Sequence, residues 1–204
     1  MTVAKNIFKA RRRVTLSLLA VVGLAACATQ PAPKYPELSY NHIPPIILGV
    51  AEIQIISANS ATNTATGVKH VEAQMPTAPE AALRAWARDR LKANGVSGVA
   101  KFVIETASVT ETDLKKTVGF KGLITKDQSH RYDSKVRATL KLEGVPRVTQ
   151  AFAQAEVSRS QSIAEDATIN EREQLWFNLT EATMKDFDPI MAQSIRKHLA
   201  DFVR

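Results

Sequence analysis

The sequence of 204 residues predicts an α+β domain, in which about four mostly antiparallel strands carry helices packed on one face. Three observations lead to this prediction. Residues 131–143 alternate between apolar and polar side chains, as a strand with one solvated face does. Residues 79–93 and the last 35 residues instead repeat apolar side chains at helical spacing. The elements follow in the order β-α-β-β-β-α, which predicts one parallel crossover and then antiparallel connections.

The first strand and first helix have clear local signals. Residues 46–57 are mostly apolar and rich in isoleucine, which favours a strand. Thr77 and Glu80 have the spacing of a capping box that would begin a helix. Gly95 supplies the stop signal, so we expect this helix to end at about Ala93.

Arg90 does not fit the pattern of this helix, because it falls on the apolar stripe. Two interpretations are open. The stem of Arg90 packs on Trp86 while its guanidinium reaches water. Alternatively, the guanidinium pairs with a buried carboxylate, for which Glu52 is the candidate.

The other three strands are expected at residues 99–109, 131–143 and 149–162. In the second of these strands, every other residue from Tyr132 to Leu142 is predicted to face the core. Alanines occupy one face of the third strand, and such small side chains indicate a helix lying close over it. The sheet is therefore expected to have one wet and one covered face.

The C-terminal residues are predicted to form two helices joined by a kink. A threonine or asparagine followed three residues later by glutamate occurs at Thr168 and at Asn170, and either can cap the first helix. Asp188 followed by Pro189 has the pattern of an N-cap and a first helical position. We therefore expect a second helix to begin at this point.

The N-terminus has the three parts of a secretory signal. Five basic residues precede an apolar run over residues 14–26, and this run is shorter than the about 20 residues of a bilayer span. Leu24, Ala25 and Ala26 then lead to Cys27, the only cysteine of the chain. This sequence resembles the lipobox of bacterial lipoproteins. The resemblance implies cleavage before Cys27, a diacylglycerol on its thiol, and an acyl chain such as palmitate on its amine.

The same resemblance implies three segments of the chain and a cellular location. Residues 1–26 would be the signal peptide, residues 27–45 the lipidated cysteine with a proline-rich tether, and residues 46–204 a single periplasmic domain. Ala28, in place of an aspartate, implies forwarding to the outer membrane. The protein would then be anchored there by lipid, facing the periplasm.

Two interpretations of the tether are open. It holds the domain away from the membrane with no binding role, because prolines favour an extended chain. Alternatively, it docks on the domain or on a partner through Tyr35 and Tyr40.

The charge of the chain is dominated by its first residues. Lysine and arginine number 27 against 20 acidic residues, a net charge of +7, but five basic and no acidic residues precede Cys27. The remainder therefore carries only +2, and no nucleic-acid partner is expected. With Cys27 as the only cysteine, no intramolecular disulfide is expected either.

The sequence carries no motif for catalysis, a cofactor or a metal. The four histidines lie far apart, and no two stand at i and i+4, so we predict no metal site. Phosphate-binding, dinucleotide-binding and serine-nucleophile motifs are absent from the sequence. Carboxylates cluster near the C-terminus, as on a solvated helix face. We therefore predict no catalytic residues, no cofactor and no enzymatic activity.

Charge segregation gives the candidate binding surface. Residues 115–147 hold nine basic and three acidic residues, whereas residues 148–190 hold three basic and eight acidic ones. A basic segment with apolar side chains suits a protein partner or an anionic lipid. The alternative is a basic, exposed sheet face without a ligand, which also resists edge-to-edge aggregation. The predicted binding residues are Lys115, Lys116, Lys121, Lys126, Arg131, Lys135 and Arg137.

A lipidated cysteine, a proline-rich tether and one small domain resemble lipopolysaccharide-assembly lipoproteins and the auxiliary lipoproteins of ABC transport systems. This resemblance implies a non-catalytic accessory subunit of an envelope assembly or lipid-transport complex. One alternative is a structural or stress-related envelope lipoprotein without a dedicated client. A periplasmic hydrolase comes third, since it would need its helix carboxylates to be buried.

Overall fold

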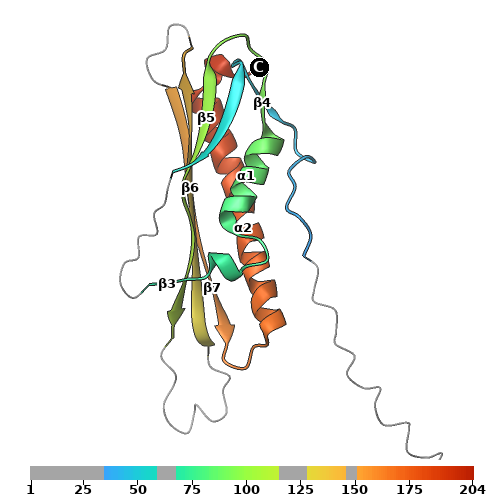
Figure 1. The fold of residues 1–204 in the computed structure, drawn as a ribbon, viewed down its shortest axis with the longest axis vertical. Coiled ribbons are helices and arrows are strands. Elements are labelled where there is room, and N and C mark those ends of the chain that lie inside the picture. The colour runs from blue at the N-terminus through green and yellow to red at the C-terminus, as the bar shows by residue number, and fades with distance from the viewer. Residues whose placement is uncertain (1–34, 59–67, 115–127, 146–150) are drawn as a thin grey trace, which may run out of the picture. The chain divides into compact units, whose positions relative to one another are not determined.

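The computed structural model describes residues 35–58, 68–114, 128–145 and 151–204, which lie within one compact unit. Its class is α+β, as predicted, with two α-helices and a mixed sheet (Figure 1). No helix among the described residues is long and apolar enough to cross a membrane. The predicted signal peptide and lipobox, with Cys27, lie outside the described residues.

The described elements follow one another along the chain with short turns or undescribed segments between them. They are β1 (Ile46–Leu48), β2 (Glu52–Ser57), β3 (Lys69–His70), η1 (Glu72–Gln74), α1 (Pro79–Arg90), β4 (Leu91–Ala93), β5 (Val99–Asp113), β6 (Gln128–Glu143), β7 (Ala151–Ala164), α2 (Ile169–His198) and η3 (Ala200–Phe202).

The main sheet has five strands, and the predicted four-stranded sheet matches it only roughly. Its order is β2-β5-β6-β7, and β3 also pairs with β5. β2 runs parallel to β5, as the predicted crossover requires, and the other pairs are antiparallel. A separate two-stranded parallel sheet joins β1 to β4.

The expected strand over residues 46–57 is split in two. At the break, the Gly49 N–H donates to the carbonyl of Phe202, and the Ala51 N–H donates to the carbonyl of Gly98. These bonds allow β1 to pair with β4 while β2 pairs with β5. Composition indicated extended chain correctly, but it carried no signal for this change of partner.

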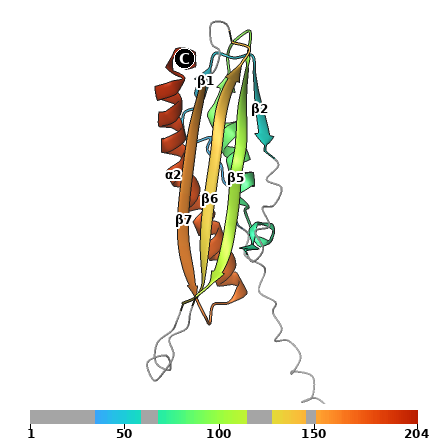
Figure 2. The ribbon, with the colours of Figure 1, turned by 90° about the vertical axis from the view of Figure 1, so that its left-hand side faces the viewer.

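The helices cover one face of the sheet. Figure 1 shows α1 and α2 side by side on one face of β5, β6 and β7, and Figure 2 looks onto the other face. On β6, the side chains from Tyr132 to Leu142 that were predicted to face inward are all buried. Ala153 and Ala155 of β7 are buried under α2, where their small side chains allow close approach. Trp86 of α1 packs against Phe102 and Phe187, with ring centroids 5.5 and 5.2 Å apart.

The predicted start and end of α1 are wrong in detail. Ala78, not Thr77, is the N-cap, and it makes no side-chain capping bond. Glu80 instead accepts hydrogen bonds from Ser57 at 2.5 Å and from Arg84 at 3.1 Å. The helix ends at Arg90 because the next three residues form β4 and pair with β1.

The prediction of two C-terminal helices is also wrong, because α2 is one helix with Pro189 inside it. A proline there removes one backbone hydrogen bond and costs about 3 kcal/mol. Phe187 and Met191, on either side of the proline, are both fully buried in the same core, and this packing offsets the cost. At the start of α2, Thr168 and Glu171 form the capping box that was one of the two predicted alternatives.

The described end of the predicted tether packs on the domain. Tyr40 is buried in the core, and its backbone N–H donates to Asp89 at 2.7 Å. The ring of Tyr35 lies 5.3 Å from that of Phe177. Residues 35–45 therefore follow the docking interpretation, in which the tyrosines hold the chain to the domain.

Candidate functional site

One face of β5, β6 and β7 points away from both helices, and no described helix covers it (Figure 2). It carries three of the predicted binding residues, Arg131, Lys135 and Arg137, which alternate along β6 with inward-facing residues. The other four, Lys115, Lys116, Lys121 and Lys126, lie outside the described ranges. The structure therefore places part of the predicted basic surface on an open sheet face.

The three described basic residues are each held by a carboxylate. Arg131 pairs with Asp133 at 3.0 Å on its own strand, and Lys135 pairs with Glu156 of β7 at 2.9 Å. Arg137 donates from Nε to the same Glu156 at 2.7 Å. These bonds lower the pKa of Glu156 below its ordinary value, first through the hydrogen bonds from Lys135 and Arg137. This part of the surface has interleaved charges and is not a free cationic patch.

A shallow concavity of about 510 Å³ lies at one end of this face. The ring of Phe152 borders it and is 54% exposed, which is high for an aromatic side chain. The floor is polar, because Glu105 accepts hydrogen bonds from Thr139 at 2.8 Å and from Gln154 at 3.3 Å. Lys141 also borders it. The concavity thus combines one apolar anchor with several hydrogen-bonding groups.

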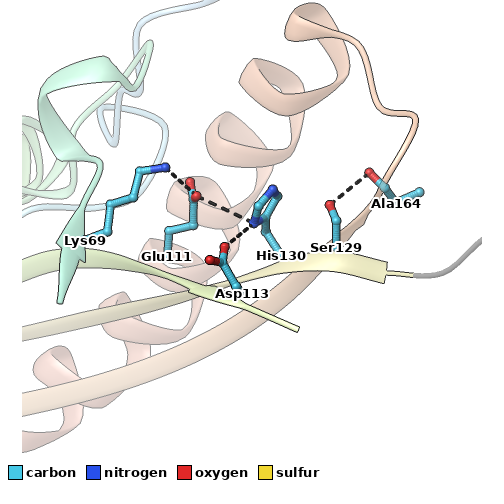
Figure 3. Close-up of polar contacts among 6 residues, drawn as sticks. All are labelled: Lys69, Glu111, Asp113, Ser129, His130 and Ala164. Carbon is cyan, nitrogen blue, oxygen red and sulfur yellow. Dashed lines mark hydrogen bonds and ion pairs between the residues drawn. The ribbon is translucent and has the colours of Figure 1, made fainter. Parts of the chain in front are cut away.

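A second cluster of polar groups lies at the other end of β5 and β6, on the helix-covered side (Figure 3). The imidazole Nδ1 of His130 lies 2.8 Å from Asp113 Oδ1 and 3.6 Å from Glu111 Oε1. The ammonium of Lys69, on β3, lies 2.6 Å from the same oxygen of Glu111. Antiparallel pairing places Asp113 directly opposite His130, so the sheet register brings these groups together.

Burial differs sharply within this cluster. The side chain of Glu111 is only 4% exposed, that of His130 is 27% exposed, and that of Asp113 is 86% exposed. Burial acts to raise the pKa of Glu111, but the Lys69 hydrogen bond and the nearby positive charge outweigh it and hold this pKa below its ordinary value. Glu111 is therefore kept as a carboxylate in a nearly closed position.

Tyr132 lies beside this cluster, directly opposite Glu111 in the sheet register. Its side chain is fully buried, and its hydroxyl shares a hydrogen bond with the Glu111 carboxylate. Burial and then the charge of Glu111 raise the pKa of Tyr132 to about 12, so the phenol keeps its proton. Tyr132 therefore remains a hydrogen-bond donor beside Glu111.

Sequence reasoning missed this cluster, although Glu111, Asp113 and His130 are a group that could hold a metal ion. The search for histidine pairs along one helix could not find it, because its members come from two strands of a hairpin. The signal that was available is the alternation of β5 and β6, which places residues two apart on one face. The register that completes the cluster is visible only in the fold.

Arg90 follows the second of its two interpretations, in which it pairs with a carboxylate. Its side chain is 5% exposed, and its Nε donates to Asp188 of α2 at 2.7 Å. The interpretation with a buried carboxylate is correct, but Glu52 is the wrong partner. Asp188 was predicted to be a helix cap, and it lies inside α2 instead.

In comparisons with known proteins, no family model matches the chain, and no curated protein matches its sequence.

Proposed function

We propose that this chain is a non-catalytic lipoprotein, anchored in the outer membrane through acylated Cys27 and facing the periplasm. In this proposal its domain is an accessory subunit of an envelope assembly or lipid-transport complex and acts through protein contacts. The resemblance of Leu24, Ala25, Ala26 and Cys27 to a lipobox supports the anchor.

The observation that best supports a partner-binding role is the uncovered face of β5, β6 and β7. Each of these strands has at least 14 residues, and no described helix lies on that face. Arg131, Lys135 and Arg137 on this face are each paired with a carboxylate, so a partner surface that carries both charges complements it better than a uniformly anionic membrane. The exposed ring of Phe152 beside a concavity is the kind of aromatic anchor that dominates binding at protein interfaces.

Site-specific photocrosslinking in intact cells tests this role. A photoreactive residue is placed at Gln154 or Ser160 on the open face and, as controls, at Lys185 or Lys197 on the exposed side of α2. We expect an adduct with the same envelope protein from both open-face positions and none from α2. Equal adducts from both sides, or none from the open face, would contradict the proposed surface and favour a lipoprotein without a dedicated client.

The anchor needs a separate test. Metabolic labelling with an alkyne fatty acid should mark the wild-type chain and leave Cys27→Ser unlabelled. The same photocrosslinked adduct should then disappear or weaken in Cys27→Ser if anchoring places the domain beside its partner. A labelled Cys27→Ser chain would show that acylation occurs elsewhere or that the lipobox assignment is wrong.

A further inference from the structure

We propose that Glu111, Asp113 and His130 form a binding site for a divalent transition-metal ion of the Zn²⁺ type at the end of the β5–β6 hairpin. This site is independent of the proposed partner-binding face, because it lies on the opposite side of the sheet (Figure 3).

The spacing of the donor atoms suits one metal ion. All three candidate ligand atoms lie within 4.8 Å of one another, with His130 Nδ1 at 2.8 Å from Asp113 Oδ1 and 3.6 Å from Glu111 Oε1. Zinc binds imidazole nitrogen and carboxylate oxygen at about 2.0–2.2 Å, so its ligand atoms stand about 3.4 Å apart in a tetrahedral site. Changes of at most about 1.4 Å in any one separation, chiefly by movement of the exposed Asp113, would bring the three donors to this spacing.

The charges also suit a divalent cation. Two carboxylates and a neutral imidazole balance two positive charges, and this donor set favours zinc and its neighbours over calcium or magnesium, which prefer oxygen alone. In the structure, the ammonium of Lys69 supplies the cation beside Glu111. Because the Lys69 side chain is 61% exposed, it can turn into solvent when a metal takes its place.

Tyr132 supplies the outer support that a metal-binding carboxylate needs. Its buried hydroxyl shares a hydrogen bond with Glu111, the most buried of the three donors, which lies directly opposite it in the sheet register. Carboxylates that bind metals are themselves held by outer hydrogen bonds, and loss of such a bond typically weakens metal affinity. The protonated phenol of Tyr132 is a donor suited to this role.

A competing interpretation is a simple ion-pair clasp, in which Lys69 and His130 tie β3 and β6 to the end of β5. The two interpretations differ in the effect of Lys69. In a clasp, Lys69 is required to hold β3 against the end of β5. In a metal site, Lys69 competes with the ion, so its removal should strengthen metal binding.

The test is a titration of the purified full-length chain with Zn²⁺ by calorimetry, and with Co²⁺ by visible absorption, whose intensity reports the coordination geometry of the bound ion. We expect one ion per chain. Asp113→Asn and His130→Gln should each weaken Zn²⁺ binding by at least about 10–100-fold, the loss that removal of an outer hydrogen-bond partner already causes. Asp113 is exposed, so its replacement should leave the fold intact. Lys69→Met should bind Zn²⁺ more tightly than the wild type.

His198→Gln is the matched control, because this exposed histidine of α2 is remote from the cluster in the sequence and on another element. It should leave Zn²⁺ affinity unchanged. Tyr132→Phe keeps the ring and removes the hydroxyl, so it should weaken binding by about tenfold while the chain remains folded by circular dichroism. The proposal is overturned if the wild type binds no Zn²⁺, or if Asp113→Asn and His130→Gln bind as tightly as His198→Gln.

Discussion

Arg90 and Asp188 form a buried ion pair, in which Nε and Oδ1 are 2.7 Å apart. The same oxygen accepts the indole N–H of Trp86 at 2.8 Å, and the Arg90 guanidinium also donates to the carbonyl of Pro44. The pair therefore joins α1, α2 and the segment that leads into β1 at one point. Neither side chain is more than 17% exposed, so each charge depends on the other.

Replacement of Asp188 by alanine should lower the free energy of unfolding by about 3–5 kcal/mol, because it leaves the Arg90 guanidinium buried without its counter-charge. Urea denaturation followed by circular dichroism measures this change. Asp201→Ala, at an exposed position in η3, is the control and should cost little. The double variant Arg90→Met with Asp188→Leu should recover much of the loss, and a double variant as unstable as Asp188→Ala would argue against an electrostatic cause.

The two threonine caps suggested by the sequence provide a matched pair. Thr168 accepts a hydrogen bond from the backbone of Glu171 and caps α2, whereas Thr77 makes no capping bond to α1. Thr168→Ala should therefore lower the free energy of unfolding by about 0.5–2 kcal/mol, and Thr77→Ala should change it much less. Thermal or urea unfolding of both variants checks this. Equal losses would mean that the substitutions act through something other than capping.

Local patterns predicted much of the secondary structure because burial repeats along each element. The alternation of β6 identified its buried side chains from Tyr132 to Leu142, since one face of the strand packs under the helices. The same reasoning identified α1 and most of α2. It failed at Pro189, where the local signal favoured a new helix and buried packing on both sides favoured a continuous one.

Local sequence patterns could not predict which residues pair across long distances in the sequence. Arg90 stood out as a charge on an apolar stripe, but its partner lies 98 residues away and has a strong local interpretation as a helix cap. The Glu111, Asp113 and His130 cluster likewise depends on hairpin register and has no motif of its own. Three of the candidate binding residues lie on a face that alternation had predicted to be solvated. Glu156, which pairs with Lys135 and Arg137 from the neighbouring strand, could not be assigned to them without the fold.

Gly95 is expected to be the least replaceable glycine near the two-stranded sheet. A Cβ atom at Gly95 would contact the backbone of Gly49 and would lie 2.6 Å from the nitrogen of Val50. Backbone atoms cannot move aside as a flexible side chain does, so Gly95→Ala should cost about 1–3 kcal/mol of unfolding free energy. Gly49→Ala is the matched control, because its nearest contact would be an ordinary 3.5 Å from the carbonyl of Phe202. Equal stability of the two variants would contradict this packing.

The ion pair between Arg159 of β7 and Asp186 of α2 should make stability depend on pH. Their side chains lie 2.6 Å apart, and the hydrogen bond from Arg159, followed by its charge, lowers the pKa of Asp186 below its ordinary 3.8. A lowered native pKa gives stability that is complete above the ordinary value and is lost as the pH falls through the native pKa. Asp186→Asn should therefore be less stable than wild type at neutral pH, and the difference should shrink on acidification below about pH 4. Urea unfolding at several pH values measures it, and a constant difference would exclude this linkage.

The basic segment between β5 and β6 provides the prediction that bears most directly on the proposed function. Reversal of its four lysines to glutamate should abolish the photocrosslinked complex, because a partner complementary to a basic surface would then meet like charge. These lysines are Lys115, Lys116, Lys121 and Lys126. The control makes the same change of charge on α1, β4 and α2, at Arg88, Lys92, Lys185 and Lys197, and should leave the complex intact. If both quadruple variants lose the complex, general electrostatic attraction is responsible. If neither does, the lysine segment contributes nothing to the complex, and the open face around Phe152 binds the partner without it.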